Sequence, residues 1–300
     1  MLIALSPSEY LRGLGFEPYD WQVDAIENAR PHRDRLLICA ARQSGKSTIV
    51  GGRALHIAKY EKNALSLIVC PAKDQSAELM QKVTGNMALD KDLSDALERD
   101  GITLKEFRNR SRIAALPGTE RSVRGYSNPR QIILDEAARV LDETYMALRP
   151  MMSRSDSHTD IIAITTAFGR RGWFYRAWNN TRNAWRKILV RIPWDLRDGR
   201  LVDAMPEDEF KAYWKAQGVN AYYSTAHNPE QLEADLEEMD PLSFRQEYCC
   251  EFLEDGGGLF NYDDIMGAFY HDQMDAIQML GDPQEAAFET SDARGPLEIL

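Results

Sequence analysis

The sequence predicts an α/β protein with buried, parallel strands. Apolar runs of strand length alternate with stretches of helical character, and these runs cover 36–39, 65–70, 131–134 and 160–167. Small and charged residues follow the first and third runs, at 45–47 and 135–136. Because the carboxyl ends of parallel strands form the edge of a sheet that carries its site, these two polar segments are the first candidates for function.

The composition is that of a folded globular chain. It has 300 residues, of which 44% are hydrophobic and 9% aromatic. No apolar run approaches the roughly 18 residues of a membrane span, and the first residues lack the features of a signal peptide. The cysteines, Cys39, Cys70, Cys249 and Cys250, have no zinc-site spacing, so we expect reduced thiols in a cytosolic protein.

Charge is distributed unevenly along the chain. Residues 1–200 contain 32 Lys and Arg against 24 Asp and Glu, a net charge of +8. Residues 201–300 contain 4 against 23, a net charge of −19. A basic body of this kind favours contact with a polyanion, although solvated surface explains charge runs equally well.

The segment 36–48 has the features of a phosphate-binding loop. Gly45 permits close approach of the backbone to a phosphate, Lys46 reaches the β- and γ-phosphates, and Ser47 supplies a hydroxyl ligand for Mg²⁺. A helix predicted at 48–60 turns its free N–H groups and positive end toward the anion. The usual pattern opens with Gly, and here that position is Ala40.

An acidic pair ends the third strand. Asp135 can bind Mg²⁺ or its water shell, and Glu136 can orient or deprotonate an attacking water. A strand that simply reaches solvent also ends in acids. The phosphate loop on a different strand favours the catalytic interpretation.

Three further features have both a functional and a structural interpretation. Gln22 and Trp21 precede the loop by one helix, where they could bind adenine or anchor that helix in the core. Thr165 and Thr166 end the fourth strand, where their hydroxyls could sense the γ-phosphate or be ordinary β-branched strand residues. Arginines concentrate at 108–130 and 170–200, which are candidate DNA contacts or solvated faces.

The remaining chain is predicted to contain several shorter elements. Helices are expected at 90–100, 173–178, 206–217, from 228, and at 240–248, and strands at 112–116, 185–193 and 249–253. A Gly-rich segment at 255–258 indicates a flexible linker. The last twenty residues are acidic and punctuated by Pro and Gly, which is typical of a loose tail.

Together, these motifs resemble the ATPase part of the large terminase subunit of tailed phages, the motor that pumps viral DNA into an empty capsid. The resemblance covers roughly residues 10–265. It rests on six features: the segment 19–22 before the loop, the loop 40–47 with its non-glycine start and internal arginine, Arg124-Gly125, the strand end 132–136, the strand tip Thr165-Thr166, and the stretch 244–252.

The resemblance implies a P-loop NTPase fold of the RecA-like type. This fold has a mostly parallel sheet with helices on both faces, plus a small helical lid. The expected organisation is an ATPase core at 1–200, a lid at 201–254, and a linker with an acidic tail at 255–300.

The resemblance also implies that ATP and Mg²⁺ are bound. The residues expected at ATP are Trp21, Gln22, Ala40, Arg42, Gln43, Ser44, Gly45, Lys46, Ser47 and Thr48. Ser47 and Asp135 would hold the metal and Glu136 would activate water. Thr165 and Thr166 would couple hydrolysis to movement. Arg42 in cis and Arg124 from a neighbouring subunit compete for the role of arginine finger, and Arg124 could instead contact DNA.

The implied partners are double-stranded DNA, further copies in a ring on the capsid portal, and the small terminase subunit, in the host cytoplasm and without a membrane. The family normally adds a C-terminal nuclease domain. Only about 45 residues follow the lid here, which is too few for such a domain, so no cutting activity is expected. The alternatives are a helicase-type DNA translocase and a non-catalytic DNA-binding scaffold with a vestigial nucleotide site.

Overall fold

The computed structural model describes residues 6–27, 34–153, 159–182 and 184–254. The chain divides into two compact units, Met1–Leu253 and Glu254–Leu300. All helices and strands of the described residues belong to the first unit. The predicted linker and acidic tail at 255–300 lie outside the described residues.

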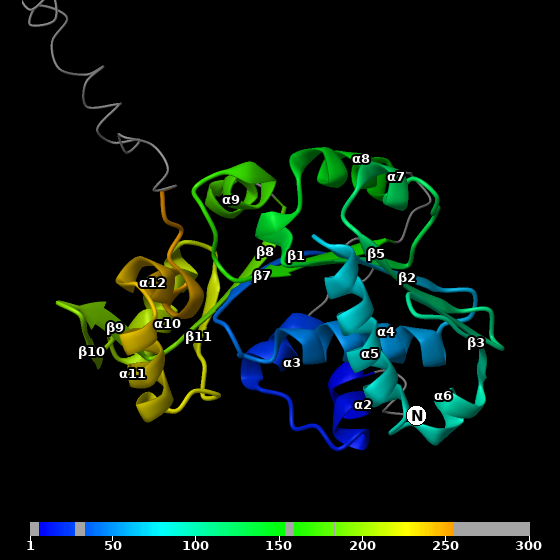
Figure 1. The fold of residues 1–300 in the computed structure, drawn as a ribbon, viewed down its shortest axis with the longest axis horizontal. Helices are drawn as coiled ribbons and strands as arrows, with labels where there is room; N and C mark the ends of the chain where they lie inside the picture. Colours follow the sequence, from blue (N-terminus) through cyan, green and yellow to red (C-terminus); the bar gives the residue numbers. More distant parts are fainter. Residues whose placement is uncertain (1–5, 28–33, 154–158, 183, 255–300) are drawn as a thin grey trace, which may run out of the picture. The chain divides into compact units, whose positions relative to one another are not determined.

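A nine-stranded sheet forms the centre of this unit, in the order β11-β8-β1-β7-β6-β2-β5-β4-β3 (Figure 1). The strands from β11 to β5 run parallel, whereas β4 and β3 run antiparallel at one edge. The strands are β1 Arg35–Ala40, β2 Leu65–Cys70, β3 Leu97–Asp100, β4 Leu104–Phe107, β5 Arg112–Pro117, β6 Gln131–Asp135, β7 Asp160–Thr165, β8 Arg186–Arg191 and β11 Asn220–Tyr223. The mostly parallel sheet confirms the predicted fold class.

Helices cover both faces of the sheet (Figure 1). One face carries α2 Pro7–Gly13, α3 Asp20–Glu27, α4 Lys46–Tyr60 and α5 Lys73–Met87, and the other carries α7 Glu120–Val123, α8 Asp142–Ser153 and α9 Gly172–Asn179. Side chains of β1 alternate between two cores: Leu36 and Ile38 join the first, and Leu37 and Cys39 join the second. A strand that is apolar on both faces is buried on both, as its sequence predicts.

Two local predictions are wrong. The charged segment 90–100 forms the short helix α6, Lys91–Asp95, and then β3, which pairs with β4 at the sheet edge. Asp90 caps α6 by accepting from the N–H of Leu93, so the helix starts as expected but is soon replaced by an edge hairpin. The strand predicted at 249–253 is absent, because α12, Pro241–Cys249, occupies its start and the following residues are irregular.

The segment 201–254 is not purely helical. It contains α10 Glu207–Ala216, α11 Pro229–Glu238 and α12, but its strand β11 extends the central sheet by pairing with β8. A separate hairpin of β9, Trp194–Arg197, and β10, Arg200–Asp203, precedes it. A third small core, which includes Leu232, Phe244 and Tyr248, packs α11 and α12 against this hairpin.

The register of the parallel strands brings their carboxyl ends to one edge. Cys39 of β1 lies opposite Thr165 of β7, and Ile164 of β7 lies opposite Asp135 of β6. The strand that leads into the phosphate loop and the strand that ends in the acidic pair are therefore separated by β7 alone. Among the residues that the structure describes, no helix is long and apolar enough to cross a membrane.

Candidate active site

The loop between β1 and α4 has the backbone that phosphate binding requires. Gln43 and Gly45 have positive φ angles of 58° and 92°, and α4 begins at Lys46 immediately after them. A Cβ atom at position 45 would lie 2.7 Å from Nε2 of Gln22. Glycine is therefore required at 45 both by its conformation and by the close neighbour. The first N–H groups of α4 face the loop without helical partners.

Lys46 lies along the start of the loop. Its Nζ is 3.3 Å from the carbonyl oxygen of Ala40 and 3.1 Å from that of Ala41. Ala40 itself is fully buried at the end of β1. Ser47 and Thr48 follow in the first turn of α4 and are half-buried. The predicted phosphate-binding residues are thus adjacent on one turn.

The acidic pair lies two strands away, at the end of β6. Glu136 adopts the left-handed conformation, with φ 48° and ψ 47°. Burial and the neighbouring charge of Glu136 raise the pKa of Asp135 to about 6, against an opposing influence of Lys46. Two carboxylates and one ammonium at the same sheet edge leave excess negative charge, which suits a divalent cation.

Thr165 connects β7 to this pair. Its Oγ1 is 3.4 Å from Oε2 of Glu136 and 2.7 Å from the carbonyl oxygen of Thr166, and it accepts from the N–H of Ala138 at 3.3 Å. Both threonines are buried. The hydroxyl at the strand tip is therefore in contact with the candidate catalytic glutamate. A residue chosen only for its preference for strands would not need this contact.

Gln22 supports the loop. Its Oε1 accepts from the N–H of Tyr19 at 2.9 Å, and its Nε2 donates to the carbonyl oxygen of Gly45 at 3.0 Å. Trp21 is buried in the first core, and its indole N–H has no hydrogen-bond partner among the described residues. The side chain of Gln22 thus contacts the backbone of the loop, while Trp21 packs as a helix anchor.

Arg42 and Arg124 belong to different elements. Arg42 lies in the loop that follows β1, and its side chain is exposed. Arg124 caps α7, which follows β5, four places from β1 in the strand order. Among the described residues that line the groove around Arg124, none belongs to the phosphate loop.

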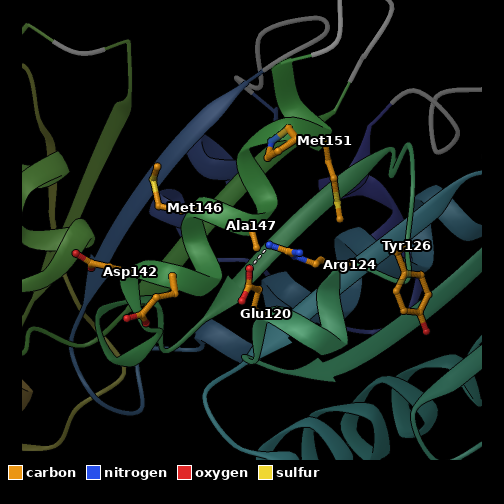
Figure 2. Close-up of a pocket in the computed structure, with 9 residues that line it drawn as sticks. Glu120, Arg124, Tyr126, Asp142, Met146, Ala147 and Met151 are labelled. Carbon is orange, nitrogen blue, oxygen red and sulfur yellow. Dashed lines mark hydrogen bonds and ion pairs between the residues drawn. The ribbon is translucent and has the colours of Figure 1, made fainter.

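Arg124 borders an open groove between α7 and α8. Figure 2 shows its side chain paired with Glu120 of the same helix. The groove has a volume of about 690 Å³ and also contains Asp142, Glu143, Tyr126 and the apolar residues Met146, Ala147, Pro150 and Met151. The side chain of Arg124 is 69% exposed, so it is accessible from outside the chain.

Two residues of the segment 201–254, called the C-terminal segment below, contact the loop and were not predicted from the sequence. Nε2 of His227 lies 2.7 Å from the carbonyl oxygen of Arg42, and the N–H of Arg42 donates to the carbonyl oxygen of Glu247 at 2.8 Å. The contact of Glu247 is made by its backbone, which leaves no signature in the sequence. His227 stands between two helical segments without a recognisable motif.

Ser47 and Asp135 are the candidate protein ligands for a metal. Among the described residues, no group of three or more His, Cys, Asp or Glu is placed to hold one. Ser47 and Asp135 supply oxygen donors of the type that Mg²⁺ prefers, with phosphate oxygens and water expected to complete its shell. The excess negative charge at Asp135 and Glu136 fits that cation.

A phosphate loop on one strand and an Asp-Glu pair two strands away, with a threonine tip between them, define a P-loop NTPase of the RecA-like class. Within that class, the family described as "Terminase large subunit, T4likevirus-type, N-terminal" matches residues 37–266. The chain belongs to this family, which confirms the predicted one. It therefore contains the ATPase region of a DNA-packaging motor protein.

Solved structures show the same fold at low sequence identity. The large terminase ATPase domain of Thermus phage P74-26 is 19% identical with a TM-score of 0.56, and the match covers 83% of this chain and 99% of that one. The large terminase of bacteriophage HK97 is 17% identical with a TM-score of 0.60, covering 79% of this chain and 51% of that one. A search of curated proteins found no match.

Proposed function

We propose that this chain hydrolyses ATP with Mg²⁺ at the loop 40–48, and that hydrolysis drives double-stranded DNA into a viral capsid. The observation that carries the proposal is the shared sheet edge of the loop and the acidic pair, with β7 between them. The contact of Thr165 with Glu136, at 3.4 Å, supports a sensing role for Thr165 beside the proposed catalytic glutamate. Membership of the terminase family supports DNA as the transported polymer.

Each residue of the loop has a defined role in this proposal. The backbone N–H groups from Gln43 to Ser47 cradle the phosphates, and Lys46 neutralises the β- and γ-phosphates. Ser47 and Asp135 would hold Mg²⁺, which neutralises phosphate charge when bound. The start of α3 forms the adenine side, with Trp21 anchoring this helix in the core and Gln22 engaged to Gly45.

Glu136 accepts the proton of the attacking water. A carboxylate poised at the strand end, beside a threonine hydroxyl, can hold a water in line with the γ-phosphate. When the γ-phosphate leaves, the hydrogen bond between Thr165 and Glu136 changes. Because Thr165 and Thr166 lead directly into the segment before α9, this change moves that segment and couples hydrolysis to movement.

Two arginines supply positive charge to the transition state from different chains. Arg42 lies in the loop and acts in cis. Arg124 is exposed in the groove between α7 and α8, which contains no described residue of the loop, so we assign it to the site of a neighbouring subunit in a ring on the capsid portal. An arginine finger is commonly worth about 10³–10⁵ in rate. The small terminase subunit is the further partner that the family suggests.

The exposed arginines of the two basic stretches are the proposed DNA contacts. Several arginines there are committed to internal ion pairs: Arg130 with Asp160, Arg186 with Asp34, and Arg191 with Asp195. Apart from Arg124, the exposed ones are Arg108, Arg110, Arg112 and Arg121 in the first stretch, and Arg170, Arg171, Arg176, Arg182, Arg197 and Arg200 in the second, where Arg176 pairs with Asp142. Contacts of this kind bind phosphate without reading sequence.

A phosphate-release assay tests the proposal. Wild-type chain with ATP and Mg²⁺ is expected to release phosphate, faster with double-stranded DNA, and the DNA effect is expected to fade as salt rises. Lys46→Ala should abolish release, while Lys62→Ala, an exposed residue just after the opposite end of α4, should leave it unchanged. Absence of Mg²⁺-dependent release by the wild type would favour a non-catalytic scaffold. Release stimulated by single strands alone would favour a helicase-type translocase.

A further inference from the structure

The backbone of Arg42 is held entirely by the C-terminal segment. Its N–H donates to the carbonyl oxygen of Glu247 on α12 at 2.8 Å. Its carbonyl oxygen lies 2.7 Å from Nε2 of His227, which precedes α11. Arg42, which follows the buried Ala41, is therefore positioned by residues that lie about two hundred positions later in the chain.

The contact with His227 determines the direction of the next N–H group. A trans peptide is planar, so the carbonyl of Arg42 and the N–H of Gln43 point in opposite directions. His227 holds the carbonyl, and the N–H of Gln43 is thereby turned away from His227. Gln43 also has a φ of 58°, which is unfavourable for a residue with a Cβ atom. This conformation needs support from outside the loop.

The ring of His227 is oriented from both ends. Its Nδ1 lies 3.0 Å from the hydroxyl of Ser224, and its ring packs edge-on against Tyr248 with centroids 5.7 Å apart. Burial lowers the pKa of His227, so the ring is neutral at pH 7 and carries one proton. Because a carbonyl oxygen only accepts, that proton belongs on Nε2, and the Ser224 hydroxyl donates to Nδ1.

We propose that His227 is a positioning residue for nucleotide binding: its Nε2–H fixes the carbonyl of Arg42 so that the N–H of Gln43 is presented to a nucleotide phosphate. The inference rests on the proposed function, since it concerns the same loop. It also links the loop to the C-terminal helices, because Tyr248 on α12 donates to Asp235 on α11 while its ring packs on His227. These helices then hold the loop in its binding conformation.

Three substitutions separate the hydrogen bond from the packing of the ring. His227→Phe keeps a ring against Tyr248 and removes the donor. His227→Gln loses the ring but carries an amide N–H at about the reach of Nε2. His227→Asn carries the same amide one methylene shorter, so its donor falls near Nδ1 instead. Gln against Asn is a matched pair that does not depend on whether the Phe variant folds.

Calorimetric titration with MgADP and with Mg²⁺ and ATPγS measures the effect, together with steady-state ATP hydrolysis. His227→Phe and His227→Asn are expected to raise the Kd for both nucleotides and the KM for ATP about tenfold, the contribution of one hydrogen bond. The value of kcat should change less than about threefold, because the contact acts on bound nucleotide in the ground state and transition state alike. His227→Gln should stay within about threefold of wild type throughout.

Equal weakening by all three substitutions would overturn the inference, since it would show that the ring acts by packing. Unchanged binding in the Phe and Asn variants would overturn it as well, even if their thermal stability fell. These outcomes differ from a failure of the proposed function. If the proposed function were wrong, the wild-type chain itself would neither bind nucleotide nor release phosphate.

Discussion

At the scale of single residues, Glu136 occupies a conformation that the local sequence does not favour. A left-handed backbone at a residue with a Cβ atom is disfavoured by about 1–2 kcal/mol. Here it turns the chain directly from β6 into the short 3₁₀ helix Ala137–Arg139 and keeps the carboxylate near Thr165. Such strain at the end of a strand is typical of a residue that acts on substrate.

Replacing Glu136 by Gln tests its role in water activation. Glu136→Gln is expected to bind ATP with nearly wild-type affinity and to lose hydrolysis by about 10²–10⁴-fold, because the amide cannot accept a proton. Phosphate release and nucleotide titration measure the two effects separately. Glu237→Gln, an exposed substitution on α11, is the matched control and should hydrolyse normally. Wild-type-like turnover in Glu136→Gln would exclude the proposed role.

Asp135 predicts a dependence of stability on pH. Its pKa in the folded chain is raised to about 6 from an ordinary 3.8, so ionisation destabilises the fold as pH rises through that window. In metal-free buffer, Asp135→Asn should raise the free energy of unfolding by about 1–3 kcal/mol at pH 8 and change it little near pH 4. Urea unfolding at the two pH values measures this. A stabilisation of the same size at both would contradict it.

At the scale of elements, α4 has two functions. Its first turn carries Lys46 and Ser47, and its body fixes that turn against the sheet and against α2. Gly52 allows the approach to α2, and Arg53 forms a buried ion pair with Asp160 at the start of β7. The helix is therefore joined to the strand that separates the loop from the acidic pair.

Gly52→Ala tests the contact between α4 and α2. A Cβ atom there would lie 2.3 Å from Cδ2 of Leu11, which is fully buried. The clash should lower the free energy of unfolding by about 1–3 kcal/mol. Gly85→Ala on α5 has no neighbour within 4 Å and should instead stabilise by about 0.5–1 kcal/mol. Opposite signs in chemical denaturation are the expected result, and equal effects would contradict the close packing.

Arg53→Met tests the tie between α4 and β7. The side chains of Arg53 and Asp160 are 6% and 3% exposed. Removing the cation leaves the buried carboxylate of Asp160 with Arg130 as its remaining charged partner. A loss of about 3 kcal/mol is expected in urea unfolding. Arg12→Met breaks an exposed pair with Glu9 and should change stability by less than about 1 kcal/mol.

At the scale of the whole molecule, the two arginines lie on different elements. Arg42 lies in the loop after β1, whereas Arg124 ends α7, which follows β5, and lines the groove between α7 and α8. If Arg124 serves the site of a neighbouring chain, as proposed, hydrolysis that needs both arginines is a property of the assembled motor.

Mixing two inactive variants tests that arrangement. Arg124→Ala and Glu136→Gln chains should each be inactive when assembled alone. Mixed assemblies should regain part of the wild-type rate, because a Glu136→Gln chain can offer its Arg124 to the intact site of an Arg124→Ala neighbour. Phosphate release across mixing ratios measures the gain. Mixing Arg124→Ala with the double variant is the control and should give none, and no gain in the first mixture would contradict a trans arginine.

The sequence predicted the parallel strands well because each is a short apolar run, and such a run fits a strand that is buried on both faces of a sheet. Leu65–Cys70 was predicted at its observed bounds, and the loop strand and the acid strand within a residue or two. Segment 90–100 was mispredicted, because a charged stretch suits an exposed helix and an edge hairpin equally. Strand β11 was missed for a related reason: its four residues are too few to show a period.

The site was predicted in part. Motifs identified Gly45, Lys46, Asp135 and Glu136, since phosphate and metal chemistry restrict the residue types at those positions. The sequence did not predict the contacts of Gln22 with Gly45 and of His227 with Arg42, and it left open whether Trp21 binds adenine or packs in the core. Each depends on which segments meet in space, and a backbone carbonyl as partner leaves no mark on the sequence.

The phosphate loop, the acidic pair and the family followed from the amino-acid sequence alone, because they depend on residue types at short, fixed spacings. Tertiary structure decided the rest: that β7 alone separates loop and acids, that Arg124 lines the groove between α7 and α8, and that residues of the segment 201–254 hold Arg42. These relations depend on strand order and long-range packing. Local propensities carry no information about either, since the contacting residues are far apart along the chain.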